Sequence, residues 1–138
     1  RKPGEEGFSL IELVVVVAVL AILSAIAIPS FTSINNKARA AAAANTVATV
    51  AKECAVKYAN GEAGTTRPVV TPDGYGAIEV TLFDTGTTAT TGCTDSGIIS
   101  VTPTAAQAGT LPAFSYDVDT GIKACTANLV GCSAAGGW

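Results

Sequence analysis

Residues 8–28 read FSLIELVVVVAVLAILSAIAI, an apolar run in which Ser9, Glu12 and Ser24 are the only polar side chains. As an α-helix that rises ~1.5 Å per residue, this run is about as long as the ~30 Å hydrocarbon core of a bilayer is thick. The run therefore predicts a helix that spans a membrane.

An ordinary secretory signal is the competing interpretation of this run, with Arg1 and Lys2 as its basic region. Two features argue against it. The small-residue cleavage pattern of such a signal should follow the apolar run, but Pro29 follows it and a helix-like stretch comes next. In addition, an acidic side chain such as Glu12 is costly inside hydrocarbon and calls for a functional explanation. Because the sequence starts with Arg1 rather than Met, we also expect part of the natural N-terminus to precede it.

The composition limits the functions that the rest of the chain can carry. Outside the apolar run, the 138-residue chain has room for one small domain, whose core needs support from disulfides or from subunit contacts. The chain has no His, no Met and only 14% charged residues, so we expect neither enzymatic activity nor a cofactor nor a metal. Its net charge of −3 argues against a general nucleic-acid-binding surface, and we expect no specific nucleic-acid partner.

The four cysteines, Cys54, Cys93, Cys125 and Cys132, have no CxxC spacing and no His companion, so disulfides are a better interpretation than a zinc site. Disulfides persist in oxidising compartments, which places the part of the chain after the apolar run outside the cytoplasm. Four cysteines allow three pairings, and the residues alone leave all three open.

The apolar run continues into an amphipathic helix that we expect to end at Gly61 or Gly64. Alanines favour a helix here, and apolar residues recur at intervals of three and four. We therefore expect one long helix over residues 8–60. Pro29 removes a backbone hydrogen bond, which predicts a kink or local unwinding near residues 25–29. At ~80 Å the helix is far too long for one small domain to bury, so its first half must protrude.

Beyond residue 64 the composition changes to Thr, Gly, Val and Pro, with short stretches that alternate like strands. We expect an antiparallel sheet of three or four strands, packed by one face on the second half of the helix through Val47 and Val50. A turn at residues 119–121 joins the last two strands. The predicted fold class is therefore α+β. The strands are predicted at residues 77–83, 97–102, 113–118 and 122–126, and the loops at residues 65–76, 85–91 and 102–112.

Aromatic side chains are expected to build the core of this small β-sheet domain, residues 61–138, which we call the head. Trp138 follows two glycines and is either disordered or an exposed contact residue, and the sequence does not decide between these two. The aromatic residues predicted to build the core are Tyr58, Tyr75, Phe83, Phe114 and Tyr116.

The sequence GFSLIE at residues 7–12, followed by the apolar run, resembles the type III signal of type IV prepilins and pseudopilins. The resemblance covers roughly residues 7–31, and the head has no comparable signature. It implies that a prepilin peptidase cuts between Gly7 and Phe8 and then methylates the new Phe8 amine, and that Glu12 is the family's acidic residue. The resulting domains are a leader at residues 1–7, the long helix at residues 8–60 with its membrane-spanning and assembly segment at residues 8–28, and the head at residues 61–138.

After cleavage, the Phe8 amine and the Glu12 carboxylate would both lie in hydrocarbon unless each neutralises the other, within one chain or between neighbours. A pair between neighbours would set the axial register of a helical filament, as one polar residue does in a coiled coil. The alternative is that Glu12 faces another membrane protein. Pro29 marks the end of this assembly segment, and Ala21 stands where the family often has a Gly.

The same resemblance implies how the cysteines pair. Many pilins have a disulfide-bounded loop near their end, which Cys125 and Cys132 would close, and Cys54 would then pair with Cys93. These bridges would tie the sheet to the helix and hold the C-terminal segment.

Asp117, Asp119 and Gly121 form a DxDxG fragment that could begin a calcium loop of the kind found in some secretion pseudopilins. The fragment lacks the remaining acidic ligands of such a loop. A polar β-turn is the favoured interpretation, and Asp117 and Asp119 remain a weak metal candidate.

The leading hypothesis is a structural protein, the main subunit of a type IV pilus, which polymerises from the bacterial inner membrane into a filament on the cell surface. Its partners would be further copies of the chain, the prepilin peptidase and the pilus assembly machinery. Such filaments support adhesion, twitching motility or DNA uptake. The alternatives are a pseudopilin of a type II secretion system, a minor pilin, and a membrane-anchored enzyme, for which no nucleophile–base pair or metal-ligand set is present.

Overall fold

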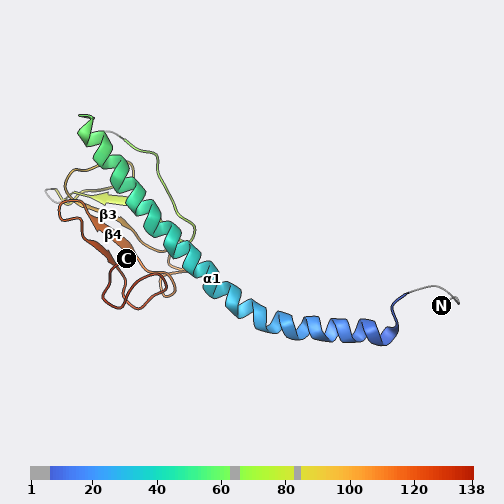
Figure 1. Ribbon diagram of the computed structural model, residues 1–138. Helices are drawn as coiled ribbons and strands as arrows, with labels where there is room; N and C mark the ends of the chain where they lie inside the picture. Colours follow the sequence, from blue (N-terminus) through green and yellow to red (C-terminus); the bar gives the residue numbers. More distant parts are fainter. Residues whose placement is uncertain (1–6, 63–65, 83–84) are drawn as a thin grey trace. The chain divides into compact units, whose positions relative to one another are not determined.

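The computed structural model describes residues 7–62, 66–82 and 85–138. It contains one long helix, α1 (Leu10–Ala59), and five β-strands (Figure 1). The α+β fold class is thereby confirmed. The chain divides into two compact units, Arg1–Asn35 and Asn36–Trp138, and α1 contributes to both, so its two parts are described separately.

In the first unit, α1 is helical without interruption through residues 25–29 and on through Pro29. The local unwinding predicted near Pro29 is therefore wrong, while the kink stays a prediction. Proline deprives the helix of only one backbone hydrogen bond, and the regular turns on either side hold the helical conformation. The Thr32 hydroxyl also donates to the Ile28 carbonyl over 3.4 Å, directly beside the proline.

Gly61 ends α1 in the second unit. Its φ of 75° is a left-handed conformation that glycine adopts without strain. The N–H of Glu62 donates to the Lys57 carbonyl over 2.9 Å, and the N–H of Gly61 donates to the Tyr58 carbonyl over 3.0 Å. This pair of bonds is a Schellman motif, and it satisfies carbonyls that have no partner within the helix.

The five strands form one antiparallel sheet in the order β2-β1-β3-β4-β5. Four of the strands fall inside the predicted stretches, and the fifth, β2, falls in the predicted loop at residues 85–91. It was missed because two exposed residues give no alternating pattern. The strand bounds are β1 (Glu79–Thr81), β2 (Thr88–Ala89), β3 (Ile98–Val101), β4 (Phe114–Asp117) and β5 (Lys123–Cys125).

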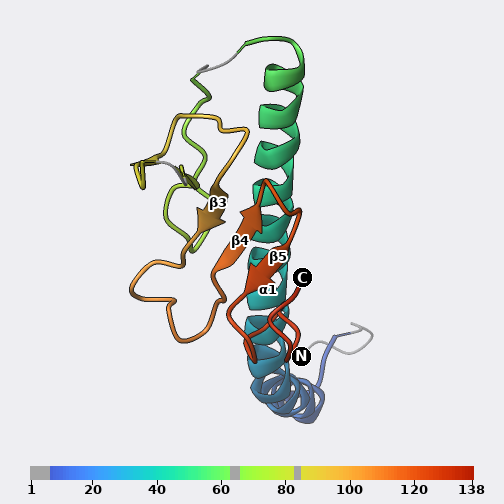
Figure 2. The ribbon, with the colours of Figure 1, turned by 90° about the vertical axis from the view of Figure 1, so that its left-hand side faces the viewer.

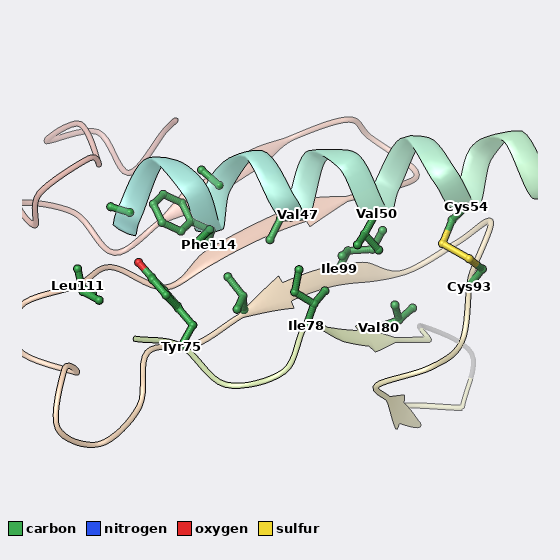
Figure 3. Packing of buried hydrophobic residues seen from close by; sticks show 14 residues of the cluster. Val47, Val50, Cys54, Tyr75, Ile78, Val80, Cys93, Ile99, Leu111 and Phe114 are labelled. Atoms are coloured by element: carbon green, nitrogen blue, oxygen red, sulfur yellow. A yellow bond between two sulfur atoms is a disulfide. The ribbon is translucent and has the colours of Figure 1, made fainter. Parts of the chain in front are cut away.

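The core lies between one face of this sheet and residues 36–59 of α1 (Figure 3). Successive side chains of a strand point to opposite faces of the sheet, and Ile99, Val101 and Phe114 lie on the face toward α1. Each of these residues is at most 1% exposed. On α1, the buried residues recur at intervals of one, three and four, as one face of a helix requires. They are Ala40, Ala43, Ala44, Val47, Val50 and Cys54.

The aromatic residues occupy this core unequally. Tyr75 and Phe114 are buried, Tyr58 and Tyr116 are half-buried, and Phe83 lies outside the described residues. Trp138 is neither disordered nor an exposed contact residue, so both expectations for it were wrong. Its half-buried ring packs edge-on against Phe114, and the ring centroids lie 5.5 Å apart. Its indole N–H donates to the Ala124 carbonyl of β5 over 3.0 Å. An aromatic ring with a satisfied N–H is stable in such a place.

Candidate functional site

Ser9 and Glu12 form a reciprocal cap at the start of α1. The backbone N–H of Ser9 donates to Glu12 Oε2 over 2.7 Å, and the backbone N–H of Glu12 donates to Ser9 Oγ over 3.3 Å. This is a capping box, which satisfies two backbone donors that have no partner within the helix. The helix N-terminus also favours the negative charge. The Glu12 carboxylate is therefore held against the residue that directly follows Phe8.

The apolar side chains that follow this cap are exposed. The stretch of α1 that is long and apolar enough to cross a membrane has none of its residues buried, and the side chain of Leu10 is 83% exposed. Within it, the Ser24 hydroxyl donates to the Leu20 carbonyl over 2.7 Å. The Ser24 hydroxyl therefore has its hydrogen-bond partner within the helix, as an apolar environment requires.

Such a segment needs an apolar environment that the described residues do not supply. Its contiguous exposed surface is of the kind that marks a membrane or protein interaction site on a soluble protein. Lipid tails would cover it in a bilayer, and the same segment of other copies would cover it in an assembly, where helices associate by close packing. The segment can therefore serve as a membrane anchor and as a packing surface.

Comparison with known families matches residues 2–28 to the prokaryotic N-terminal methylation motif, the signal of type IV pilins. The chain therefore carries the N-terminal signal of type IV pilins. The match includes Gly7, Glu12 and the whole apolar run, and it ends at Ile28. No significant match was found among curated proteins or among solved structures. Pilin-type proteins are structural rather than enzymatic, and the motif implies a precursor that a prepilin peptidase processes before assembly.

The residues predicted for processing lie just before α1. Gly7 and Phe8 are outside the helix, and the side chain of Phe8 is 81% exposed. A peptide bond in an exposed, non-helical stretch is accessible to a peptidase. Cleavage between these residues and methylation of Phe8 stay predictions, as do the assembly roles of Glu12 and Pro29.

The structure joins Cys54 to Cys93 and Cys125 to Cys132, which are the two pairs that the pilin resemblance implies. The first bridge connects α1 to the segment that leads into β3, and Figure 3 shows it at the end of the core. The second bridge closes a short loop after β5. One disulfide thus fastens the head to α1, and the other closes a loop within the head.

The DxDxG fragment forms the turn between β4 and β5. Asp117 Oδ1 accepts the backbone N–H groups of Asp119 and Thr120 over 3.0 Å and 3.1 Å, and Gly121 has a φ of 70°. This is an Asx-type turn, in which a carboxylate replaces a backbone acceptor. Among the residues that the structure describes, no three His, Cys, Asp or Glu side chains gather where a metal could bind, so the calcium hypothesis for Asp117 and Asp119 gains no further ligand.

Arg67 is a buried charge that the sequence patterns do not reveal. Its side chain, in a residue only 3% exposed, donates to the carbonyls of Gly92, Pro68 and Ile78 over 3.1 Å, 3.4 Å and 3.0 Å. Burial lowers the pKa of its guanidinium, and the nearby Glu53 carboxylate acts in the opposite direction. Five N–H donors in a fixed plane suit this site, where three carbonyls from outside the strands converge.

Two further contacts tie the loop before β1 to the rest of the head and to α1. Arg39 Nε on α1 lies 2.8 Å from Asp73 Oδ2, although its N–H does not point at that oxygen, so the pair is electrostatic rather than a hydrogen bond. The Tyr75 hydroxyl donates to the Pro112 carbonyl over 2.9 Å, and burial raises the pKa of Tyr75 to about 12. These polar contacts, together with the isolated β-bridge between Tyr75 and Pro103, hold the loop before β1 in place.

Replacing Arg67 by Met is expected to lower the free energy of unfolding by about 3 kcal/mol, because it leaves buried carbonyls without donors. Urea unfolding of the full chain in detergent micelles, followed through the fluorescence of the single tryptophan, measures this loss. Lys37→Met is the matched control, since Lys37 is exposed on α1, and its effect should stay within about 0.5 kcal/mol. Equal effects of the two substitutions would show that the Arg67 contacts do not stabilise the head.

Proposed function

We propose that the chain is the major structural subunit of a type IV pilus and that its activity is polymerisation. One observation supports this proposal above the others: an apolar helix with none of its membrane-length stretch buried, capped by a single carboxylate at the end that carries the methylation motif. Before assembly this helix holds the precursor in the bacterial inner membrane. In the filament, the helices of many copies replace the lipid and the heads face solvent on the cell surface.

The mechanism begins at the peptide bond between Gly7 and Phe8. Cleavage there by the prepilin peptidase creates a charged amine on Phe8, which the same enzyme methylates without removing its charge. The capping box supports neutralisation of this amine, because it already holds the Glu12 carboxylate 2.7 Å from the neighbouring Ser9 nitrogen. Within one chain that pairing keeps the subunit stable in lipid, and between copies it selects one axial offset of the helices.

The cellular roles proposed for the filament depend on its location at the cell surface. Adhesion, twitching motility and DNA uptake are properties of whole pili, and each requires the exported, disulfide-bonded head on the surface. A pseudopilin of a type II secretion system or a minor pilin would be processed in the same way but would not dominate surface filaments. Abundance in sheared filaments therefore separates the major pilin from both.

Unreduced intact-mass spectrometry of filaments sheared from the source cells tests the proposal. The expected species begins at Phe8, carries one additional methyl group and lacks four cysteine hydrogens, as two disulfides require. A Gly7→Val chain serves as the control and should remain uncleaved and in the membrane. Processed chain that stays in the membrane fraction, with none in the sheared fraction, would refute the major-pilin role and point to a minor pilin or pseudopilin.

A further inference from the structure

A groove of about 300 Å³ lies between α1 and strands β4 and β5. Figure 2 shows these two strands in front of the helix. The helix contributes a wall of alanines, whose small side chains leave its backbone accessible to close approach. The sheet contributes Tyr116 from β4 and Lys123 from β5, which stand opposite Lys52 of the helix. We call this site the lysine groove, and it is lined by Ala48, Ala51, Lys52, Ala55, Tyr116 and Lys123.

Three hydrogen-bond donors line this groove, and no carboxylate does. Among the described residues, neither Lys52 nor Lys123 forms an ion pair, and the Tyr116 hydroxyl has no hydrogen-bond partner, whereas Tyr58 and Tyr75 both donate to backbone carbonyls. Lys123 is held in place because its ammonium nitrogen lies 4.7 Å from the centroid of the Trp138 ring. The groove therefore offers a partly ordered set of donors that match an anion.

Three other basic side chains of the second unit have partners, whereas Lys37 is exposed on α1 and forms no ion pair with a described residue. Arg39 lies against Asp73, Lys57 lies 3.6 Å from the Glu53 carboxylate, and Arg67 is bound to backbone carbonyls. Lys52 also borders the hollow on the outer face of α1, which Lys57, Glu53 and Glu62 line as well. Two lysines that form no ion pair with a described residue thus meet in the lysine groove, although the chain as a whole carries a net charge of −3.

We propose that the lysine groove receives a carboxylate side chain from the head of a second copy of this chain, so that it forms a lateral contact within the filament. This contact rests on the proposed function, because polymerisation brings heads of like net charge close together. Copies that each carry −3 repel at contact distances unless opposite charges meet locally. The groove is large enough for a side chain with its neighbours, and the alanine wall allows a second backbone to approach.

The head offers the matching acidic groups. Several of its carboxylates are exposed and form no ion pair with a described residue, so they are available to a neighbour. A carboxylate bound by two ammonium groups and a phenol hydroxyl gains charge-assisted hydrogen bonds at an interface that excludes water. The available carboxylates are Glu62, Glu79, Asp95 and Asp119.

Zero-length carbodiimide coupling of sheared filaments tests this contact, because the reagent joins an amine to a carboxylate only where the two already touch. We expect a covalent dimer whose mapped peptides link Lys52 or Lys123 to a head carboxylate of another copy. The Lys52→Ala, Lys123→Ala double substitution should abolish this dimer, because it removes both amines that react. Lys57→Ala is the matched control on the same helix, and its dimer yield should equal that of the unmodified chain.

Acetylation rates of single lysines supply the second measurement. Lys52 and Lys123 should react about tenfold more slowly in filaments than in subunits dispersed in detergent. Equal rates in intact filaments, or dimers linked only through other lysines, would refute the contact and leave the filament proposal standing. Protection that arises only when duplex DNA is added would also refute it, in favour of a phosphate ligand. Absence of filaments from the unmodified chain would refute the proposed function and this contact together.

Discussion

A Glu12→Val subunit is expected to yield about a hundredfold fewer filaments than the unmodified chain, while its head unfolds at the same urea concentration. An unneutralised charge costs ~3 kcal/mol at the centre of a membrane helix, which corresponds to about a hundredfold in an equilibrium. The valine removes the only carboxylate in the apolar run and leaves the Phe8 amine without its proposed partner. The head should be unaffected, because Glu12 lies in the other compact unit of the chain.

Glu12 closes the capping box and is proposed to supply a charge for assembly, and Glu12→Gln separates these two effects. An amide at this position can still accept the Ser9 N–H, so the capping box survives the substitution, while the negative charge is lost. If the charge sets assembly, Glu12→Gln should fail nearly as completely as Glu12→Val. Quantifying sheared filaments from cells that produce equal amounts of each subunit measures the difference.

The converse substitution, Ser9→Ala, removes the hydroxyl half of the cap and keeps the carboxylate. It should cost the helix about 1 kcal/mol at its N-terminus and leave filaments abundant. Normal filaments from Glu12→Gln, together with few from Ser9→Ala, would show that the cap rather than the charge is what assembly needs. The charge-pair and register hypothesis would then be wrong.

The long helix and most of the sheet could be predicted because their signals are local. The alternation in residues 97–102 follows the burial of β3, since one face of a sheet must be apolar, and the stretch at residues 113–118 contains β4, whose first residue Phe114 is buried. The end of α1 was also readable, because Gly61 supplies a left-handed residue after a run of helix formers. The predicted helix, at residues 8–60, and the observed one differ by two residues at the start and one at the end.

Other features depend on what the fold brings together. The capping box was present in the sequence as Ser-x-x-Glu at residues 9–12, and attention to that spacing would have found it. No local sequence pattern marks Arg67. Its three carbonyl partners belong to the adjacent Pro68, to Ile78 just before β1, and to Gly92, which is more than twenty residues away. The lysine groove depends likewise on Lys52 and Lys123, which are distant in sequence and meet only because the sheet packs on α1. Long-range polar contacts of this kind have no periodic pattern.

Removing the Cys54–Cys93 bridge by substituting both cysteines with Ala is expected to lower the free energy of unfolding by about 4 kcal/mol, and removing the Cys125–Cys132 bridge by about 2.5 kcal/mol. In the chain-entropy model a bridge stabilises by restricting the unfolded chain, so the bond that spans 39 residues contributes more than the bond that spans 7. Cys54 is also 1% exposed within the core, so its loss removes packing as well. Urea unfolding of the full chain in micelles, read from Trp138 fluorescence, ranks the two double variants, and each is the matched control of the other. A larger loss of unfolding free energy from the Cys125–Cys132 pair would contradict this ranking. It would show that the short C-terminal loop and the packing of Trp138 on Phe114 stabilise the head more than the bridge to α1 does.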